Sequence, residues 1–291
     1  MKLATFTHAG ATGVGVVVGD EVVDLAAAAP QLPQELTALL AAGPDALAAA
    51  ERAAERAATR IALADVKLEP PVLRPPKVLA IGLNYSEHIK ESGLAESKVP
   101  TVFNKQSTAV TGPYDPIHLP RASRAVDYEG ELGFVIGRRC RHVPKERAFE
   151  VIAGYLLVND VSVRDWQLRT PTMTMGKSFD THCPLGPWIT TSDSVDDPHS
   201  LGIRTWVNGE LRQDSNTKKL IYGCDELVEH LSTAFTLEPG DVIATGTPAG
   251  VGFVMKPPRY LLAGDEVRIE IEGLGRIENP VIEEPENTAR I

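Results

Sequence analysis

Three carboxylates recur at every second position of one short stretch, as Asp127, Glu129 and Glu131, and strand-forming apolar residues follow them. In a β-strand, residues two apart point to the same face, so the stretch predicts one acidic row. Such like charges repel unless water or a cation neutralises them, and hard divalent cations such as Mg²⁺ prefer oxygen ligands. The pattern indicates a metal site, but it is also typical of an exposed edge strand with solvated acids.

A second acidic motif favours the metal. Asn159 and Asp160 close another apolar segment, residues 154–158, which predicts a strand that ends in a carboxylate. Arg164 and Gln167 follow and are three apart, so on a helix they would share a face. Such a pair can grip a substrate carboxylate or carbonyl, whereas an exposed ion pair between Arg164 and Asp165 is the simpler alternative.

An imidazole and a carboxylate lie close together in the segment after residues 78–82, which read as a buried strand. His88 and Glu91 are three apart, and one helical turn would place them side by side. A carboxylate beside an imidazole orients the ring, fixes its tautomer and raises its basicity, as a general base requires. A surface helix with an incidental His–Glu pair gives the same pattern.

Two loops carry further candidate residues. Lys177 stands among small residues in a loop, which suits a functional lysine, although most loop lysines are solvated. Residues 238–252 read as a strand that opens into a glycine-rich loop containing Gly246 and Thr247. Backbone N–H groups in such loops bind carboxylates or phosphates. The loop lacks the Gly-Lys-Ser/Thr ending of a P-loop, so a nucleotide site is not indicated.

The elements that must position these residues fall into two parts. Residues 1–70 predict a small α+β subdomain, with short strands between residues 2 and 24 and helices near 34–42 and 44–60. A proline-rich extended segment, residues 67–77, marks a natural boundary. Residues 71–291 predict a β-rich catalytic domain, and its Asn208-Gly209 turn is a strong hairpin signal.

Bulk properties exclude several classes of function. The 291 residues are 43% hydrophobic and 23% charged, as expected of an ordinary globular protein. A net charge of −10 argues against a nucleic-acid partner. Three widely spaced cysteines form neither a zinc pattern nor a disulfide framework. The first residues lack a signal core and no segment is long enough to span a membrane, so we expect a cytoplasmic protein.

Taken together and in order, these segments resemble the fumarylacetoacetate hydrolase family from about Lys77 to Ile282. Within the family, the chain is most similar in type to bacterial 2-hydroxyhepta-2,4-diene-1,7-dioate isomerases and acylpyruvate hydrolases. Each motif alone is weak evidence for the family, but all six motifs in this order make a specific match. They are Gly82–Glu91 (GLNYSEHIKE), Asp127–Leu132 (DYEGEL), Asn159–Gln167 (NDVSVRDWQ), Gly176–Asp180 (GKSFD), Pro184–Pro187 (PLGP) and Pro239–Gly252 (PGDVIATGTPAGVG).

The resemblance implies a predominantly β fold of the α+β class, a mixed β-sandwich roll that usually forms a homodimer and holds one Mg²⁺ or Mn²⁺ per site. By position it implies three metal ligands and moves Asp127 outside the ligand set, as a supporting or solvated residue. It implies the following roles: Glu129, Glu131 and Asp160 as metal ligands, His88 and Glu91 as the acid–base pair, Lys177 as a further catalytic cation, and Arg164, Gln167, Thr247 and Gly246 as substrate contacts.

Three functions fit these residues. The first is a metal-dependent hydrolase that cleaves a C–C bond in an acylpyruvate or other 2,4-dioxo acid through an enolate. The second keeps fold and metal but isomerises or decarboxylates a 2-oxo or 2-hydroxymuconate-type diacid, including oxaloacetate. The third is a non-catalytic binding module in which a cation serves stability. The convergent positive charge of Lys177 and Arg164 argues against the third, because a structural cation site does not need it.

Overall fold

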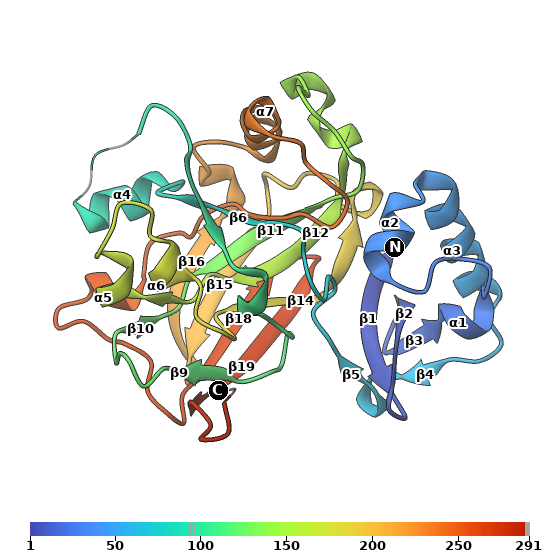
Figure 1. Ribbon diagram of the computed structural model, residues 1–291, viewed down its shortest axis with the longest axis horizontal. Helices are drawn as coiled ribbons and strands as arrows, with labels where there is room; N and C mark the ends of the chain where they lie inside the picture. The colour runs from blue at the N-terminus through green and yellow to red at the C-terminus, as the bar shows by residue number, and fades with distance from the viewer. Residues whose placement is uncertain (94, 96, 289–291) are drawn as a thin grey trace.

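The computed structural model describes residues 1–93, 95 and 97–288, and most of its regular structure is β-strand. The largest sheet is twelve-stranded and mixed, and it crosses the whole molecule (Figure 1). In spatial order its strands are β4 (Ile61–Ala62), β3 (Glu21–Asp24), β2 (Ala11–Val18), β1 (Lys2–His8), β14 (Cys183–Thr191), β12 (Ile152–Asn159), β11 (Gly130–Ile136), β17 (Val242–Ala244), β6 (Val78–Gly82) and β7 (Thr101–Lys105), with β5 (Lys67–Leu68) beside β1 and β8 (Val110–Thr111) beside β14.

A five-stranded sheet packs against the central part of the large one. Its order is β16 (Glu210–Asn216), β15 (Gly202–Val207), β18 (Glu266–Ile271), β19 (Gly275–Glu283) and β9 (Ile117–Leu119). Leu132 and Phe134 of β11 share one fully buried core with Ile269 and Ile277 of the smaller sheet. Alternation along each strand places these apolar residues on the facing sides. The arrangement confirms the predicted α+β fold with a β-sandwich.

The helices are short and lie around the sheets. α1 (Leu25–Ala28), α2 (Leu36–Ala41) and α3 (Pro44–Arg56) cover the N-terminal strands, at the right of Figure 1. α4 (Ser86–Ser92), α5 (Arg164–Gln167) and α6 (Thr174–Lys177) gather at the opposite end, and α7 (Cys224–Ala234) covers a third side. Lys177 therefore ends a helical turn and does not lie in an open loop.

The N-terminal residues extend the large sheet. β1 pairs with β14 in the register Lys2↔Thr190 and Leu3↔Ile189, so the sheet runs from the first residues into the region that carries the acidic motifs. The predicted strands near residues 2–24 and the two predicted helices are confirmed, and α1 is an addition that sequence reasoning missed. The boundary near residue 70 stays a prediction, because the sheet itself is continuous.

The acidic stretch is not one strand, so the prediction of a single acidic row was wrong. β10 (Val126–Asp127) pairs with β13 (Ser162–Val163) in a separate two-stranded ladder, and β11 starts only at Gly130. Asp127 turns away to meet Arg164, as described below. This break separates Asp127 from Glu129 and Glu131 and leaves two acids, not three, to meet Asp160.

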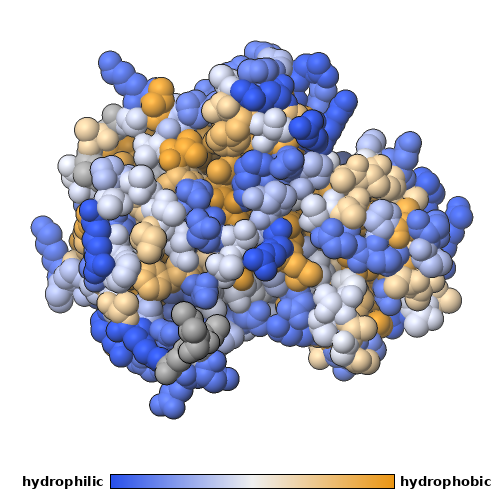
Figure 2. All heavy atoms as spheres, in the orientation of Figure 1, coloured by the Kyte–Doolittle hydropathy of each residue, from blue (hydrophilic) through white to orange (hydrophobic). Residues whose placement is uncertain are grey.

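Figure 2 shows hydrophobic side chains near the middle of one face and mostly hydrophilic ones around its periphery. Along the described chain, every helix is too short or too polar to cross a lipid bilayer.

Candidate functional site

Three buried carboxylates meet in the large sheet, where β11 begins and its neighbour β12 ends. Glu129 precedes β11, Glu131 lies in it, and Asp160 follows β12, which pairs with β11 in the register Gly130↔Asn159. The backbone N–H of Asp160 donates to the carbonyl of Glu129 at 2.9 Å and holds the two chain segments together. One carboxylate oxygen from each residue lies within 4.8 Å of the others, and none of the three residues is more than 5% exposed.

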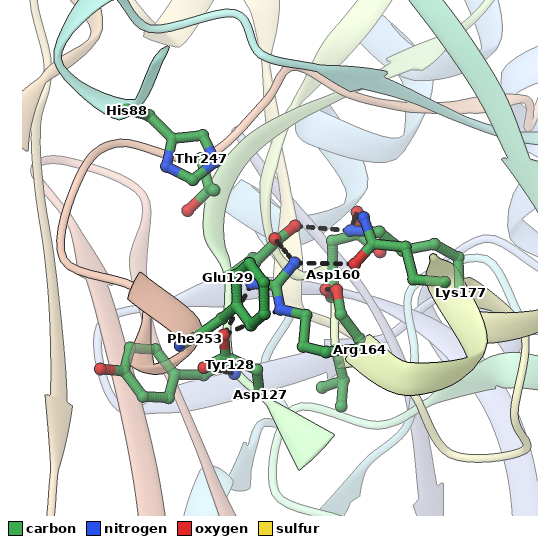
Figure 3. A network of polar contacts seen from close by, with 12 residues as sticks. His88, Asp127, Tyr128, Glu129, Asp160, Arg164, Lys177, Thr247 and Phe253 are labelled. Atoms are coloured by element: carbon green, nitrogen blue, oxygen red, sulfur yellow. Dashed lines mark hydrogen bonds and ion pairs between the residues drawn. The ribbon is translucent and has the colours of Figure 1, made fainter. Parts of the chain in front are cut away.

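Three buried cations surround this carboxylate cluster, and Figure 3 shows two of them, Lys177 and Arg164, beside Glu129 and Asp160. Lys177 Nζ lies 2.6 Å from Glu129 Oε2 and 2.7 Å from Asp160 Oδ2. Arg164 Nη1 lies 2.7 Å from Glu129 Oε1. On the other side, Lys105 Nζ lies 2.7 Å from Asp160 Oδ1 and is itself 2% exposed. Glu129 and Asp160 are thus each paired twice.

Glu131 is the exception in this charge pattern. Among the described residues it makes no ion pair, and its Oε2 accepts one hydrogen bond, from the backbone N–H of Gly246 at 2.7 Å. Burial, with the charges of Asp160 and Glu129, raises the pKa of the Glu131 carboxyl well above its usual value. Burial alone would also raise the pKa of Glu129, but Lys177 and Arg164 hold it well below the usual range.

The donor set fits a divalent cation. Four buried carboxylates (Asp127, Glu129, Glu131 and Asp160) face three buried cations (Lys105, Arg164 and Lys177), which leaves one negative charge uncompensated. The uncompensated group is Glu131, one of the three residues whose oxygens converge. Hard divalent cations take such oxygen ligands, and their charge would remove the electrostatic cost of Glu131.

Asp127 is buried and holds a neighbouring loop, so it is not solvated. Its carboxylate accepts from Arg164 Nε and Nη2 at 2.9 and 2.7 Å and from the backbone N–H groups of Gly252 and Phe253 at 2.9 Å each. Arg164 therefore spans Asp127 and Glu129, and the ring of Phe253 lies under its guanidinium at 5.6 Å. This use of Asp127 explains why it is absent from the carboxylate cluster.

The predicted acid–base pair forms on α4, and His88 lies above Glu129 in Figure 3. His88 Nδ1 lies 2.7 Å from Glu91 Oε1, and the backbone N–H of Gly250 donates to both Glu91 oxygens at 3.1 and 3.0 Å. Because a carboxylate accepts, Nδ1 of His88 carries the hydrogen and Nε2 is left as the basic nitrogen. His88 also lies close enough to Glu129 to lower the pKa of that carboxyl.

The glycine-rich loop, residues 246–253, binds carboxylates of the protein itself. Its N–H groups donate to Glu131 from Gly246, to Glu91 from Gly250, and to Asp127 from Gly252 and Phe253. The loop therefore lies along residues 127–131 and is also hydrogen-bonded to α4, from Gly250 to Glu91. Gly246 and Thr247 reach the site, and their predicted contact with substrate stays a prediction.

Arg164 orients the side-chain amide of Gln167. Arg164 Nη1 donates to Gln167 Oε1 at 3.0 Å, and the amide nitrogen of Gln167 has a weak contact with the sulfur of Met173 at 3.6 Å. Among the described residues, the second amide hydrogen of Gln167 has no partner. The structure thus brings all ten predicted site residues into one region, together with Asp127, which the resemblance had placed outside the ligand set, and Lys105, whose pairing with Asp160 was not predicted.

The chain is similar to known proteins over most of its length. A family model described as Fumarylacetoacetate (FAA) hydrolase C-terminal matches residues 77–282. The mitochondrial oxaloacetate tautomerase fahd2 of Xenopus laevis is 42% identical over 272 residues, which are 93% of this chain and 85% of the relative.

Solved structures are similar over nearly the whole chain. Maleylpyruvate hydrolase from Sphingobium sp. SYK-6, in complex with manganese(II) ion and pyruvate, is 38% identical with a TM-score of 0.82. The 2-hydroxyhepta-2,4-diene-1,7-dioate isomerase from Mycobacterium marinum is 34% identical with a TM-score of 0.78. Each similarity covers 98% of this chain and 100% of the other.

Proposed function

Because the chain belongs to the fumarylacetoacetate hydrolase family, we propose that it is a metal-dependent enzyme that interconverts the keto and enol forms of a small 2-oxo dicarboxylic acid such as oxaloacetate. The observation that carries this proposal is the His88–Glu91 pair, which leaves Nε2 as the basic nitrogen of a ring that lies near Glu129. Tautomerisation needs proton transfer at carbon and charge stabilisation at oxygen, and these residues supply both. The naming of similar proteins as oxaloacetate tautomerases supports the choice of substrate.

Proton transfer is the task of His88. Its Nε2 takes a proton from the carbon beside the substrate carbonyl and delivers it to the carbonyl oxygen, which gives the enol, and the reverse steps return the proton to carbon. The imidazolium that forms is stabilised by Glu91, whose carboxylate is held by the N–H of Gly250. The reaction moves one proton from carbon to oxygen, so it consumes neither water nor a redox partner.

Negative charge that develops on the substrate oxygen meets Lys177. Its ammonium group has three hydrogens, and Glu129 and Asp160 accept two, so one remains for the substrate. Gln167, whose oxygen is held by Arg164, has one further amide hydrogen for a carboxylate or carbonyl oxygen of the substrate. Such fixed donors in a buried site stabilise developing charge without having to reorganise.

A divalent cation fits Glu129, Glu131 and Asp160. When bound, Mg²⁺ or Mn²⁺ would act as a Lewis acid that polarises the 2-oxo group. Manganese is present in the related maleylpyruvate hydrolase structure, which supports a metal in this family without choosing between the two ions here.

A second candidate is C–C hydrolysis of an acylpyruvate. The similarity to maleylpyruvate hydrolase favours it, and the same His88 could take a proton from water before water attacks the distal carbonyl. This reaction needs a positioned water molecule in addition to the proton transfer. We place it second because tautomerisation requires only the residues already described.

For assembly we propose a homodimer, to be tested by light scattering.

The deciding experiment uses the purified protein with Mg²⁺ or Mn²⁺ in D₂O, with oxaloacetate, maleylpyruvate and an acylpyruvate followed by NMR. We expect deuterium to enter the methylene of oxaloacetate faster with the metal than in a chelated control. No carbon dioxide should be released. Pyruvate together with a free carboxylic acid would support the hydrolase instead, and carbon dioxide would support a decarboxylase. No metal-dependent change in any substrate would contradict both candidates.

A further inference from the structure

We propose that Gln213, on β16 of the smaller sheet, is a positioning residue that sets the orientation of the Thr247 hydroxyl and fixes the peptide between Glu129 and Glu131. Gln213 is fully buried, and its three hydrogen bonds all reach these two parts of the site. It comes from a different sheet than the carboxylates. The activity part of the test rests on the proposed function, and the other parts do not.

The contacts of Gln213 are short and use the whole amide group. Nε2 donates to Thr247 Oγ1 at 2.7 Å and to the carbonyl of Pro248 at 2.9 Å. Oε1 accepts from the backbone N–H of Gly130 at 3.0 Å. A backbone N–H can only donate and a backbone carbonyl can only accept, so the amide has one possible orientation.

That orientation fixes the direction of the Thr247 hydroxyl. Thr247 Oγ1 lies 3.0 Å from the carbonyl of Gly130, which accepts, so the hydroxyl hydrogen points there. One lone pair of Oγ1 is used by Gln213. A hydroxyl has one hydrogen and two lone pairs, so among the described residues one lone pair has no partner, and Thr247 can accept a hydrogen bond in the site.

Gln213 also acts on the spacing of two carboxylates. Gly130 joins Glu129 to Glu131, and both polar groups of this residue are held: its N–H by Gln213 and its carbonyl by Thr247. A Cβ at Gly130 would lie 3.3 Å from Gln213 Oε1, so the acidic strand fits closely against β16. Loss of the Gln213 amide would free this peptide and the carbonyl of Pro248 together.

The test combines one amide-deleting variant, one partner variant and one matched control. Gln213→Met keeps the length of the side chain and removes all three hydrogen bonds. Thr247→Val removes the hydroxyl, and the double variant completes a cycle. Ser215→Ala is the control, because Ser215 lies on the same strand and its buried Oγ has no hydrogen-bond partner among the described residues.

We expect Gln213→Met to lower kcat/KM by about tenfold or more, as loss of a buried hydrogen bond commonly does. The double variant should lose no more than the larger of the two single losses. Mn²⁺ affinity, measured by electron paramagnetic resonance without substrate, should fall in Gln213→Met and stay unchanged in Ser215→Ala. Two single losses that multiply, or unchanged Mn²⁺ affinity and kcat/KM in Gln213→Met, would overturn the proposal.

A measurement on the unmodified protein keeps the proposal testable if Gln213→Met does not fold. The amide hydrogen of Gly130, the first residue of β11, should exchange with solvent as slowly as those of the middle of the strand, because Gln213 holds it in the core. Exchange at the rate of an exposed loop would mean that the hydrogen bond is absent and would refute the assignment. Neither this measurement nor Mn²⁺ affinity depends on the substrate, so failure of the proposed function would leave both interpretable.

Discussion

Glu131 and Gly246 are joined by a hydrogen bond of 2.7 Å in which the backbone N–H of Gly246 donates to Oε2 of a carboxylate that has no ion-pair partner among the described residues. Glu129 and Asp160, a few ångströms away, are each paired twice with cations. The contrast makes Glu131 the residue through which a bound cation would stabilise the fold.

The first prediction concerns this residue. Glu131→Gln keeps an acceptor for Gly246 and removes the uncompensated charge. Burial raises the pKa of Glu131 in the folded state, so at pH 7 its ionisation opposes folding. The metal-free variant should therefore be more stable than the metal-free native protein, by about 1–3 kcal/mol, and should no longer be stabilised by Mn²⁺. Melting curves with and without chelator measure both effects, and equal stabilisation of both proteins by Mn²⁺ would contradict the ligand assignment.

The second prediction concerns the acid–base pair. His88→Ala should lower kcat by about 10²–10⁴, the usual contribution of a general base, while Mn²⁺ affinity stays unchanged. Glu91→Gln should cause a smaller loss, because the amide can still accept from Nδ1 but lacks the negative charge. Glu87→Gln is the matched control on the same helix, since Glu87 pairs with Lys219 at the surface. A full loss in Glu87→Gln would mean that the position of α4, rather than the pair, controls activity.

The third prediction concerns Asp127. Asp127→Asn should destabilise the protein by about 3 kcal/mol, because it removes one of the two carboxylates that pair with the buried guanidinium of Arg164. Activity should fall by at least about tenfold as Arg164 and Phe253 lose their anchor. Mn²⁺ affinity should change little, in contrast to Glu131→Gln. If Asp127→Asn abolished Mn²⁺ binding, Asp127 would have to be counted among the ligands.

The fourth prediction concerns pH. His182 is fully buried, its Nε2 donates to the carbonyl of His118 at 2.8 Å, and burial lowers its pKa to about 3. The unfolded histidine titrates near 6.5. Between pH 6.5 and pH 3 the unfolded state therefore binds a proton that the folded state does not bind. Stability should fall as pH drops below about 6.5, by up to about 1.4 kcal/mol per pH unit.

Denaturant titrations at pH 6.5, 5.5 and 4.5 measure this slope. His182→Gln should flatten it, whereas His230→Gln, at an exposed position of α7, should leave it unchanged. An unaltered slope in His182→Gln would assign the effect to the carboxylates.

Local signals in the sequence predicted most of the elements and the membership of the site. The strands near residues 2–24, the helical turn that pairs His88 with Glu91 and the Asn208-Gly209 hairpin follow from periodicity and turn chemistry. The break in the strand after Asp127 does not follow from local signals, because it depends on Arg164, which is 37 residues away.

Other features depend on contacts of still longer range. Nothing in the local sequence around Lys105 shows that it pairs with Asp160, 55 residues later. The glycine-rich loop was predicted to bind a carboxylate or a phosphate, and its contact with substrate stays a prediction. That its partners include Glu131 and Asp127 of the chain itself follows only from the packing of distant segments.

The loop of residues 246–253 also determines when the site can form during synthesis. It contacts the acidic stretch across separations of 115, 117 and 125 residues. While the chain grows on the ribosome, Glu131 and Asp127 are made long before the N–H groups that bind them. The acidic stretch therefore waits in a partly folded chain, and the centre assembles only after nearly all of the protein has been translated.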